Sequence, residues 1–401
     1  MLVSFEQATK IINKTITHIS KTETIAITQA CGRVIAEEIH ANIDMPPFNR
    51  AAMDGYAVRA QDTFGASTQK PKFLKIISEL EAGKSGRLHV SIGIKQACRI
   101  ATGAKLPEHA NAVIMLEETG VEVNNKIKIT SAVAPGENIS IKGEDIKKGS
   151  LVIRRNDILN ASKIGALAGL GYCKIEVYCK PLIAVIPTGS ELCKPGVRLK
   201  DGSVYDINTY TVSCIVEQNG CTAVRFPAVP DDKKAINKIA FGQALQHCDL
   251  VVFSGGSSVG QRDLLPAVIQ ECGKILFHGI QIKPGKPTMF GTVKTKPVFC
   301  LPGYPTSCLL NAELLLAPAL RKLARMPEKE LKTVKAKLSE RVHGSTGRRF
   351  FMTVKLEKGS AVPVFKESGA ITSVSEADGY IEIPENIDVL EKGETVTVVL
   401  F

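Results

Sequence analysis

A glycine-rich loop that ends in an acid could bind a phosphate group. It reads SGGSSVGQRD (254–263) and follows the apolar run LVVF. Gly255, Gly256 and Gly260 would let backbone N–H groups approach a phosphate at the N-terminus of a helix. The spacing fits neither of the two standard glycine motifs for nucleotides. Asp263 either holds a divalent cation that bridges to the phosphate or caps the following helix, and this loop alone leaves both interpretations open.

Two lysines form a second candidate for anion binding. In IKPGKPTMFG (282–291), Lys283 and Lys286 are each followed by proline, which fixes φ and stiffens the loop. The alternative is a solvated surface turn. Ordering a lysine side chain costs up to about 2 kcal/mol of rotamer freedom. A stiff backbone is useful where two ammonium groups must meet an anion, so the pattern favours an anion site.

Two segments in the first half of the chain carry polar groups in turns. For PPFNRAAMDGYAV (46–58), the composition favours a domain-crossing linker in which Asp54 accepts hydrogen bonds from turn amides. In RIATGAKLP (99–107), a strand is followed by Thr102 and Gly103, which offer a hydroxyl and an N–H group as donors.

Three further polar residues have structural alternatives. Glu191 in TGSEL (188–192) is either a helix cap or a carboxylate of an anion site, and the pattern does not decide between them. Asp145 in GEDI is interpreted as a turn former, and His278 as a histidine within a strand.

The scaffold for these loops is predicted in residues 179–326 as a parallel sheet covered by helices on both faces. Continuous apolar strands alternate there with amphipathic helices. The predicted strands are PLIAVIP, VYD, TAVRF, DLVVF, KILFHGIQI and PVFCL, and the predicted helices are TYTVSCIVEQNG, KKAINKIAFGQALQ, LLPAVIQECG and SCLLNAELLLAPALRKLA. The loops TGSEL, DINT, VPDD, SGGSSVG and PGYP all follow strands, so ligands are expected beyond the carboxyl ends of the strands.

The remainder of the chain predicts further domains around this sheet. Residues 5–40 are predicted to be largely helical, including CGRVIAEEI, and the helical pattern returns in ILNASKIGALAGLGY. Short alternating strands between these segments indicate an inserted β-rich module, and the tail has FFMTVKL, YIEIP and TVTVVLF as strands. The predicted fold is α/β plus β, with a helical linker domain (1–45 and 146–178), an inserted β-rich domain (46–145), a three-layer α/β domain with a mainly parallel sheet (179–326) and a C-terminal β domain (327–401).

Composition limits the classes of function. The 401 residues suffice for two to four domains, and hydrophobic residues make up 44%. The formal charge of +11 comes from dispersed lysines without an aromatic platform, so anionic ligands are expected rather than nucleic acid. No apolar stretch or N-terminal signal pattern indicates a membrane or secretion, which predicts a cytoplasmic protein. The eleven cysteines include no C-x-x-C pair, and buried reduced thiols are expected, as at Cys173, Cys214, Cys272 and Cys300.

From the residues alone, we expect an anion site at the strand ends of a parallel α/β domain. Carboxylates beside a phosphate imply Mg²⁺. The substrate class is then nucleotide-like or an oxyanion, and the residues do not name it.

Seven motifs together resemble those of a known family. PPFNRAAMDGYAV, RIATGAKLP, GEDI, TGSEL, SGGSSVGQRD, KPGKP and LPGYP occur in the order seen in molybdopterin molybdenumtransferases, which include the E domain of gephyrin and of the plant cofactor-insertion protein. The resemblance extends to SGAITSVSEADGYIEIP (368–384) and so covers nearly the whole chain. It implies a C-terminal β-barrel-like domain and an elongated homodimer, in which the 46–58 segment completes the partner's active cleft.

The reaction implied by the resemblance inserts molybdate into adenylylated molybdopterin and releases AMP, with Mg²⁺ as cofactor. The implied catalytic residues are Asp54, Glu191 and Asp263, and Mg²⁺ would lie at Asp263 and Asp206. The implied contacts with molybdopterin are Thr102, Gly103, Thr188, Gly189, Asp206, Gly255, Gly256, Ser257, Gly260, Pro302 and Gly303. The implied molybdate pocket consists of Ser258, Lys283, Lys286, Pro287, Arg348 and Ser373.

The sequence also departs from the family pattern. Gly279 stands where many members have Arg or Lys, and Tyr304 stands where Asn is common. Phe350 and Thr353 replace an acid and a second Arg that often follow Gly347-Arg348. These differences bear on the choice between molybdate and tungstate.

The expected partners are an upstream molybdopterin adenylyltransferase and downstream molybdoenzymes or carriers. Two other functions compete with metal insertion. One is a non-catalytic scaffold of the same fold that binds molybdopterin. The other is the adenylyltransferase itself, which lacks segments resembling 1–178 and 327–401.

Overall fold

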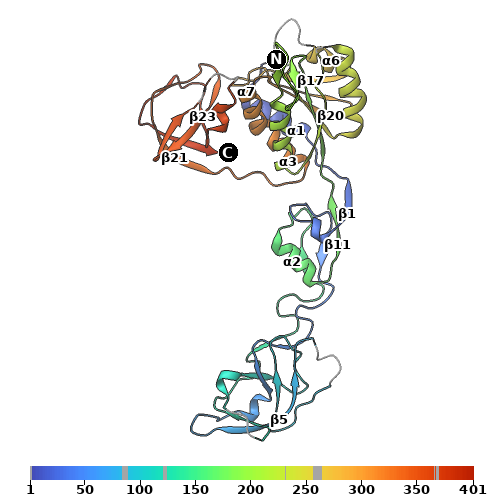
Figure 1. Ribbon diagram of the computed structural model, residues 1–401, viewed down its shortest axis with the longest axis vertical. Coiled ribbons are helices and arrows are strands. Elements are labelled where there is room, and N and C mark those ends of the chain that lie inside the picture. The colour runs from blue at the N-terminus through green and yellow to red at the C-terminus, as the bar shows by residue number, and fades with distance from the viewer. Residues whose placement is uncertain are drawn as a thin grey trace. The chain divides into compact units, whose positions relative to one another are not determined.

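The computed structural model describes residues 2–83, 89–120, 124–230, 232–255, 264–364, 366 and 370–401. The chain divides into two compact units (Figure 1). Unit one comprises Met1–Glu23, Gly32–Val34 and Val177–Phe401, and unit two comprises Thr24–Cys31 and Ile35–Glu176. None of the described helices is long and apolar enough to cross a membrane.

Unit one contains a six-stranded sheet in the order β15-β12-β16-β20-β19-β17. Its strands are β15 (Thr222–Arg225), β12 (Leu182–Pro187), β16 (Leu250–Ser254), β20 (Lys296–Leu301), β19 (Met289–Val293) and β17 (Gly273–His278). The first four strands pair in parallel, and β19 runs antiparallel to both of its neighbours. The mainly parallel sheet is therefore confirmed, but β19 was missing from the sequence-based prediction because Pro287 and Gly291 gave its segment the composition of a loop.

Both faces of this sheet are buried, which explains the continuous apolar strands. In β12, Ile183 and Val185 belong to one hydrophobic cluster, while Ala184 and Ile186 belong to another. Figure 1 shows α6 on one side of β17 and β20, and α1, α3 and α7 on the other. The helices are α1 (Phe5–Thr15), α3 (Asn208–Gln218), α4 (Lys233–Ile236), η4 (Asn237–Ala244, a π-helix), α5 (Leu245–His247), α6 (Leu265–Cys272), α7 (Pro305–Asn311), η5 (Ala312–Leu316, a π-helix) and α8 (Ala317–Leu323).

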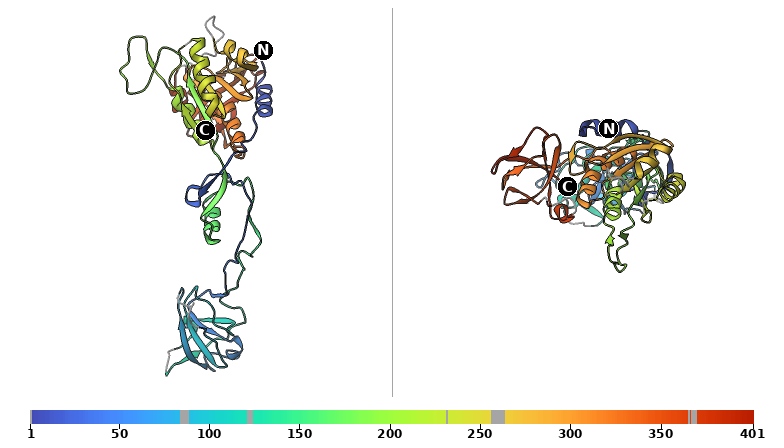
Figure 2. Two further views of the ribbon diagram at one scale, coloured as in Figure 1. Left: turned by 90° about the vertical axis from the view of Figure 1, so that its right-hand side faces the viewer. Right: turned by 90° about the horizontal axis from the view of Figure 1, so that it is seen from above.

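Two of the predicted strands of this domain lie elsewhere. The VYD segment forms β14 (Val204–Tyr205), which pairs with β13 (Leu192–Cys193) in a separate parallel ribbon. Figure 2 shows this ribbon as a green arm that projects from the α/β domain. The KILFHGIQI segment is split, because the chain turns at Gly279 and the last residue of the segment, Ile282, begins β18 (Ile282–Lys283) in the C-terminal sheet.

The C-terminal part of unit one is a closed five-stranded barrel, as the predicted β-barrel-like domain requires. The strands follow the order β23-β24-β21-β27-β25, and β25 pairs back onto β23. They are β21 (Thr333–Leu338), β23 (Arg349–Glu357), β24 (Ser360–Pro363), β25 (Gly379–Ile383) and β27 (Thr395–Leu400). Beside them lie the pair β22 (Val342–His343) and β26 (Val389–Leu390) and the short helix α9 (Thr372–Ser375). Strand β18 pairs in parallel with β23.

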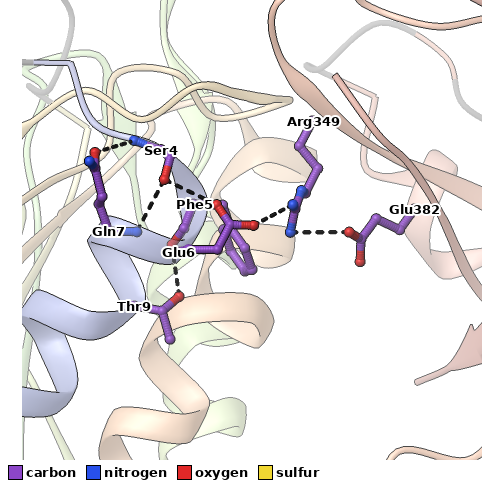
Figure 3. Close-up of polar contacts among 7 residues, drawn as sticks. All are labelled: Ser4, Phe5, Glu6, Gln7, Thr9, Arg349 and Glu382. Atoms are coloured by element: carbon purple, nitrogen blue, oxygen red, sulfur yellow. Dashed lines mark hydrogen bonds and ion pairs between the residues drawn. The ribbon is translucent and has the colours of Figure 1, made fainter. Parts of the chain in front are cut away.

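Helix α1 is tied to the barrel by an ion-pair network (Figure 3). A capping box fixes the start of α1: Gln7 N donates to Ser4 Oγ (3.2 Å), and Ser4 N donates to Gln7 Oε1 (3.0 Å). The Arg349 guanidinium of β23 pairs with Glu6 of α1 and with Glu382 of β25, the latter at 3.1 Å. The charge of Arg349 is therefore balanced within the structure.

Unit two is rich in short strands. Its main sheet has the order β7-β4-β6-β5-β8. The strands of this sheet are β4 (Gly55–Val58), β5 (Lys72–Leu80), β6 (Gln96–Ile100), β7 (Ala112–Met115) and β8 (Lys126–Ile129). Two separate strand pairs accompany it. In one, β3 (Arg50–Ala51) pairs with β9 (Ile139–Ser140), and in the other, β2 (Ile39–His40) pairs with β10 (Leu151–Ile153). Short 3₁₀ turns lie at η2 (Ala60–Asp62) and η3 (Leu116–Glu118).

The prediction of a largely helical segment over residues 5–40 was wrong. Helix α1 ends at Thr15, and β1 (Thr22–Ala26) and a 3₁₀ turn, η1 (Ile27–Gln29), follow. CGRVIAEEI is not helical: Ile35 N donates to Asp157 O (3.0 Å), a contact with a distant segment that helical hydrogen bonds would preclude. The predicted helix in ILNASKIGALAGLGY is present as α2 (Ala161–Gly169), and β11 (Lys174–Tyr178) follows it.

The cysteine prediction was also wrong in part. Cys300 is buried in β20, but Cys173, Cys214 and Cys272 are exposed. Cys214 lies in an apolar run of α3, but its side chain is exposed, because a helix exposes one face even where its sequence is apolar.

Candidate functional site at the carboxyl edge of the sheet

The loops after adjacent parallel strands meet at one edge, as their positions in the sequence predict. Thr188 N donates to Ser254 O (3.0 Å), which joins TGSEL to the end of β16. Gly255 N donates to Leu301 O (3.1 Å), and Gly189 N donates to Val229 O (3.1 Å). The structure therefore brings together the segments TGSEL, VPDD, PGYP and the start of SGGSSVG.

Gly255 lies where two backbones approach each other closely. Its φ of +94° is one that side chains disfavour, and a Cβ there would lie 2.8 Å from Thr188 O and 3.0 Å from Thr188 Oγ1. Gly303 is adjacent, with its own Cβ position 3.4 Å from Gly255 Cα. Asn208 Nδ2 donates to Gly303 O (2.8 Å), so α3 is fixed to the same edge, and Pro302 is buried beneath it.

Buried polar atoms without partners are concentrated at this edge. Thr188 Oγ1, Asn208 Oδ1, Thr209 Oγ1 and Ser254 Oγ are buried and make no hydrogen bond to any of the described residues. An unsatisfied buried polar group costs about 1–3 kcal/mol. Four such groups at one edge support a polar ligand there. Asn208, Thr209 and Ser254 were not among the predicted site residues, although DINT and the first residue of the glycine loop contain them.

The two predicted site acids that the structure describes in unit one, Glu191 and Asp206, do not lie side by side. Glu191 is exposed and its carboxylate lies over Gly189, where a Cβ would be 2.5 Å from Glu191 Oε1. Its interpretation as a helix cap is wrong, because the strand β13 follows. Asp206 follows β14 at the opposite end of the ribbon, and its Oδ1 accepts a hydrogen bond from Thr209 N (3.0 Å).

Asp206 retains the capacity to hold a cation. Its Oδ1 accepts the hydrogen bond from Thr209 N, and its Oδ2 has no hydrogen bond or ion pair within the described part of the chain. The described residues contain no group of three His, Cys, Asp or Glu side chains suited to a metal ion. Mg²⁺ commonly binds through one or two carboxylates plus substrate phosphates and water, so a single acid at this edge fits it.

The lysine loop is held by a buried asparagine. The peptide bond Lys283–Pro284 is cis. Asn311 Nδ2 donates to Pro284 O (3.2 Å), and Asn311 Oδ1 accepts from Thr288 Oγ1 (3.1 Å). Gly285 has φ +111°, and a Cβ there would lie 1.8 Å from Asn311 Nδ2, so only glycine fits.

Within this loop, Lys283 is half-buried, Pro287 is half-buried and Lys286 is exposed. The Lys283 Nζ lies 4.4 Å from the centre of the Phe350 ring. Arg348, two residues before Phe350 in the sequence, is half-buried. It lies in a turn in which its backbone N–H donates to Ser345 O (2.8 Å).

Ser373 is fully buried in α9, and its Oγ accepts from Lys366 N (2.9 Å). Its hydroxyl proton has no acceptor among the described contacts and remains available to donate. Thr306 Oγ1 of α7 donates to Ala370 O (2.7 Å), which fixes this segment to the end of the sheet that carries PGYP. No described contact joins Ser373 or Arg348 directly to the lysines.

Asp54, Thr102 and Gly103 lie together in unit two. Asp54 Oδ1 accepts from Thr102 N (2.6 Å) and from Thr102 Oγ1 (2.7 Å). These bonds, the backbone one first, lower the pKa of Asp54 below its ordinary value. Gly103 N donates to Ala51 O (2.9 Å). The geometry agrees with the interpretation of Asp54 as a turn residue, and the carboxylate is exposed.

Five predicted residues, Gly256, Ser257, Ser258, Gly260 and Asp263, lie outside the described residues. Helix α6, which follows them, begins at Leu265 with Leu264 in the N-cap position. Asp145 is exposed and its N–H donates to Met45 O (3.1 Å), as expected of a turn. His278 ends strand β17 as predicted, but its Nε2 is buried and has no hydrogen-bond partner among the residues that the structure describes.

Comparison with known protein families accounts for nearly all of the chain. Residues 3–171 match the family described as the MoeA N-terminal region (domain I and II). Residues 184–322 match the probable molybdopterin binding domain, and residues 335–401 match the MoeA C-terminal region (domain IV).

Individual proteins are similar over the same length. A putative molybdopterin biosynthesis protein of Methanocaldococcus jannaschii is 38% identical over 388 residues, 95% of this chain and 92% of the relative. A molybdopterin molybdenumtransferase of Staphylococcus aureus is 32% identical over 384 residues, 94% of this chain and 90% of the relative. Two crystal structures of molybdopterin biosynthesis MoeA proteins from Pyrococcus horikoshii give TM-scores of 0.86 and 0.82 at 42% and 34% identity, covering 100% of this chain and 99% and 100% of theirs.

Proposed function

Because this chain belongs to the MoeA family of molybdopterin molybdenumtransferases, it is a transferase of molybdenum cofactor biosynthesis, and we propose that it inserts molybdate into adenylylated molybdopterin with release of AMP. The observation that carries this proposal is the carboxyl edge of the sheet, where four buried polar atoms have no hydrogen-bond partner in the described part of the chain and lie beside close-packed glycine backbone. A ligand rich in polar groups would supply those partners.

The molybdopterin end of the substrate is assigned to this edge in unit one. Thr188, Gly189, Gly255, Pro302 and Gly303 are the described residues that we assign to this contact. Gly256, Ser257 and Gly260 are assigned to it because their motif resembles that of the family. Buried hydroxyls and backbone N–H groups suit the phosphate and the pterin, because both need directed hydrogen bonds.

The molybdate is assigned to the lysine loop. Molybdate is a tetrahedral dianion, so it needs positive charge and several hydrogen-bond donors. Lys283, Lys286 and Arg348 supply charge, Ser258 and Ser373 supply hydroxyls, and Pro287 stiffens the loop. The buried Ser373 hydroxyl proton is free to donate, as this role requires.

Cleavage of the adenylate is assigned to the acids. Mg²⁺ held by Asp206 and Asp263 would neutralise charge on the phosphates. Glu191 would orient a water molecule or the substrate for cleavage of the phosphorus–oxygen bond, with AMP as the leaving group. Asp54 would act in the same way from a second copy of the chain, in a homodimer whose active site is shared between subunits.

The wider setting of the reaction follows from its chemistry. A molybdopterin adenylyltransferase must supply the substrate, and molybdoenzymes or carriers must accept the product. Nucleic acid has no part in the reaction, and a cytoplasmic location agrees with the composition.

The test is release of AMP from freshly prepared adenylyl-molybdopterin by the purified protein. We expect release to require both molybdate and Mg²⁺. Tight molybdopterin binding without AMP release would instead support a non-catalytic scaffold. ATP-dependent formation of the adenylate would support the adenylyltransferase alternative, and either result would overturn the proposal.

A further inference from the structure

The register of two strands places Lys283 against Phe350. Strand β18 pairs in parallel with β23, and its residues Ile282 and Lys283 lie opposite Arg349 and Phe350. The Lys283 Nζ lies 4.4 Å from the centre of the Phe350 ring, within the range of a cation–π interaction. Phe350 is only 1% exposed, because its ring belongs to the core of the barrel.

The neighbouring cation, Arg349, has carboxylates as its partners, whereas Lys283 has an aromatic ring. Arg349 pairs with the carboxylates of Glu6 and Glu382 (Figure 3), so its charge is neutralised. Of the ion pairs and hydrogen bonds in the described part of the chain, none involves the Lys283 ammonium group. The half-buried Lys283 thus has an aromatic face as its described partner in place of a carboxylate.

We propose that Phe350 is the positioning residue for Lys283, and that its ring sets the affinity of this site for a tetrahedral oxyanion. This inference rests on the proposed function, because it takes Lys283 as a contact of molybdate. The ring attracts the ammonium through its quadrupole and holds the lysine in one place before the anion arrives.

Two physical effects favour the ring over an acid. An aromatic ring carries no net charge, so it does not repel a dianion as a carboxylate at the same distance would. It also accepts no strong hydrogen bond, so the three N–H donors of Lys283 remain available to the anion. A lysine held in advance loses less rotamer freedom when it binds, which raises affinity.

The sharpest test changes the electrons of the ring and leaves its shape intact. Phe350 is replaced by 4-fluoro-, 3,5-difluoro- and pentafluorophenylalanine in the full-length protein, because fluorine progressively weakens the ring quadrupole. Binding of molybdate, and separately of tungstate, is measured by titration calorimetry. We expect the dissociation constant to rise stepwise, by about tenfold in total, and KM for molybdate to rise while kcat of AMP release changes little.

Phe351 provides the matched control. It is equally buried on the same strand but contacts the rings of Phe5 and Tyr380 rather than a lysine. The same fluorinated series at Phe351 should leave molybdate binding unchanged. Phe350→Glu adds the opposite case, in which a negative charge should lower molybdate affinity further than any fluorinated ring.

The outcomes separate the two proposals. If the unmodified protein binds no molybdate, or if Lys283→Ala leaves molybdate binding intact, the oxyanion site of the proposed function is wrong. If Lys283→Ala abolishes binding but the Phe350 series gives a flat response, the function stands and the role of Phe350 is wrong. A graded response at Phe350 and none at Phe351 supports the inference.

Discussion

At the scale of single residues, the candidate site contains buried polar atoms that have no hydrogen-bond partner among the described residues, and a bound ligand would supply such partners. Thr188 Oγ1 is the clearest case, because it is buried at the strand ends and no described residue forms a hydrogen bond with it. Such a group lowers stability in the free protein and raises affinity for a ligand that bonds to it. Removal of the Thr188 hydroxyl should therefore raise or preserve the free energy of unfolding and lower the affinity for the ligand.

Thr188→Val tests this. The substitution keeps the shape and removes the hydroxyl, so we expect the free energy of unfolding to stay constant or rise by up to about 1 kcal/mol. Binding of molybdopterin should weaken by about tenfold. Urea unfolding and ligand titration measure the two effects.

The control is the same substitution at Thr63 in unit two. Thr63 Oγ1 donates to Ala60 O (2.7 Å) and accepts from Val133 N (3.1 Å), so both of its capacities are used. Thr63→Val should lower stability by about 1–3 kcal/mol and leave ligand binding unchanged. A loss of stability in Thr188→Val as large as that in Thr63→Val would contradict our interpretation.

Asp54 can be tested for a structural or a catalytic role. Its pKa is lowered by the bonds from Thr102, so the stabilisation of this turn is fully present above the ordinary Asp pKa of about 3.9 and is lost as the pH falls through the lower folded pKa. Asp54→Asn retains an acceptor oxygen but not the charge. We expect it to keep much of the turn's protection while AMP release falls by at least about tenfold.

Hydrogen exchange over residues 99–107, corrected for intrinsic rates, measures the turn between pH 5 and pH 2.5. In the unmodified protein, protection should decline toward the lower pH, whereas the Asn variant should show a flatter profile. Thr102→Val is the matched variant that removes one donor and retains the charge. Normal AMP release by Asp54→Asn would leave Asp54 as a turn residue only.

At the scale of elements, the lysine loop depends on one glycine and one asparagine. Gly285 and Asn311 are packed so closely that no Cβ fits between them. Asn311 lies at the end of α7, whose first turn follows the PGYP loop, so one helix fixes both the lysine loop and the sheet edge.

Gly285→Ala should therefore move the loop away from α7 and raise KM for molybdate by at least about tenfold, since the lysines would be displaced. Gly196→Ala is the control. It also has a positive φ, of +87°, but has open space around its Cβ position. Both variants place an alanine in a left-handed backbone conformation, so this strain is common to the two. A similar KM for molybdate in both variants would show that the collision with Asn311 has no effect on the site.

The elements also show what the sequence could predict. The alternation of apolar strands and helices identified the parallel sheet, because strands buried on both faces have a distinctive composition. The ligand site at the carboxyl edge of this sheet stays a prediction. Strand β19 was not predicted, because a proline precedes it and a glycine lies within it. CGRVIAEEI was predicted to be a helix because the spacing of its apolar residues fits a helix. Its conformation is instead determined by backbone hydrogen bonds to distant segments of the chain.

The site could be predicted only where the chain places residues on neighbouring loops. Thr188, Gly255 and Gly303 meet as strand order requires. Phe350 beside Lys283 could not be foreseen, because it depends on the pairing of a two-residue strand with a barrel strand more than sixty residues later in the chain.

At the scale of the whole molecule, the two units have separate cores. Leu74 is 1% exposed in a cluster made only of unit-two residues, and Leu320 is fully buried in a cluster of unit one. Each unit can therefore unfold as a cooperative body with its own transition.

Matched leucine truncations test this independence. Leu74→Ala and Leu320→Ala should each cost about 2–5 kcal/mol in their own unit. Differential scanning calorimetry of the full-length chain should show two transitions, and each variant should lower only one of them. Equal shifts of a single transition by both variants would contradict the division.

Strand β18 has one further consequence, for attempts to cut or recombine the chain. It emerges from the α/β domain only three residues after β17, yet its partner is the barrel strand β23. A shortened protein that ends before residue 333 would leave this strand edge unpaired and would remove Phe350, the aromatic partner of Lys283. The barrel is thus not a removable appendage, and a chimera that exchanges it would have to carry over the matching β18 segment to keep this strand pair and the Lys283–Phe350 contact.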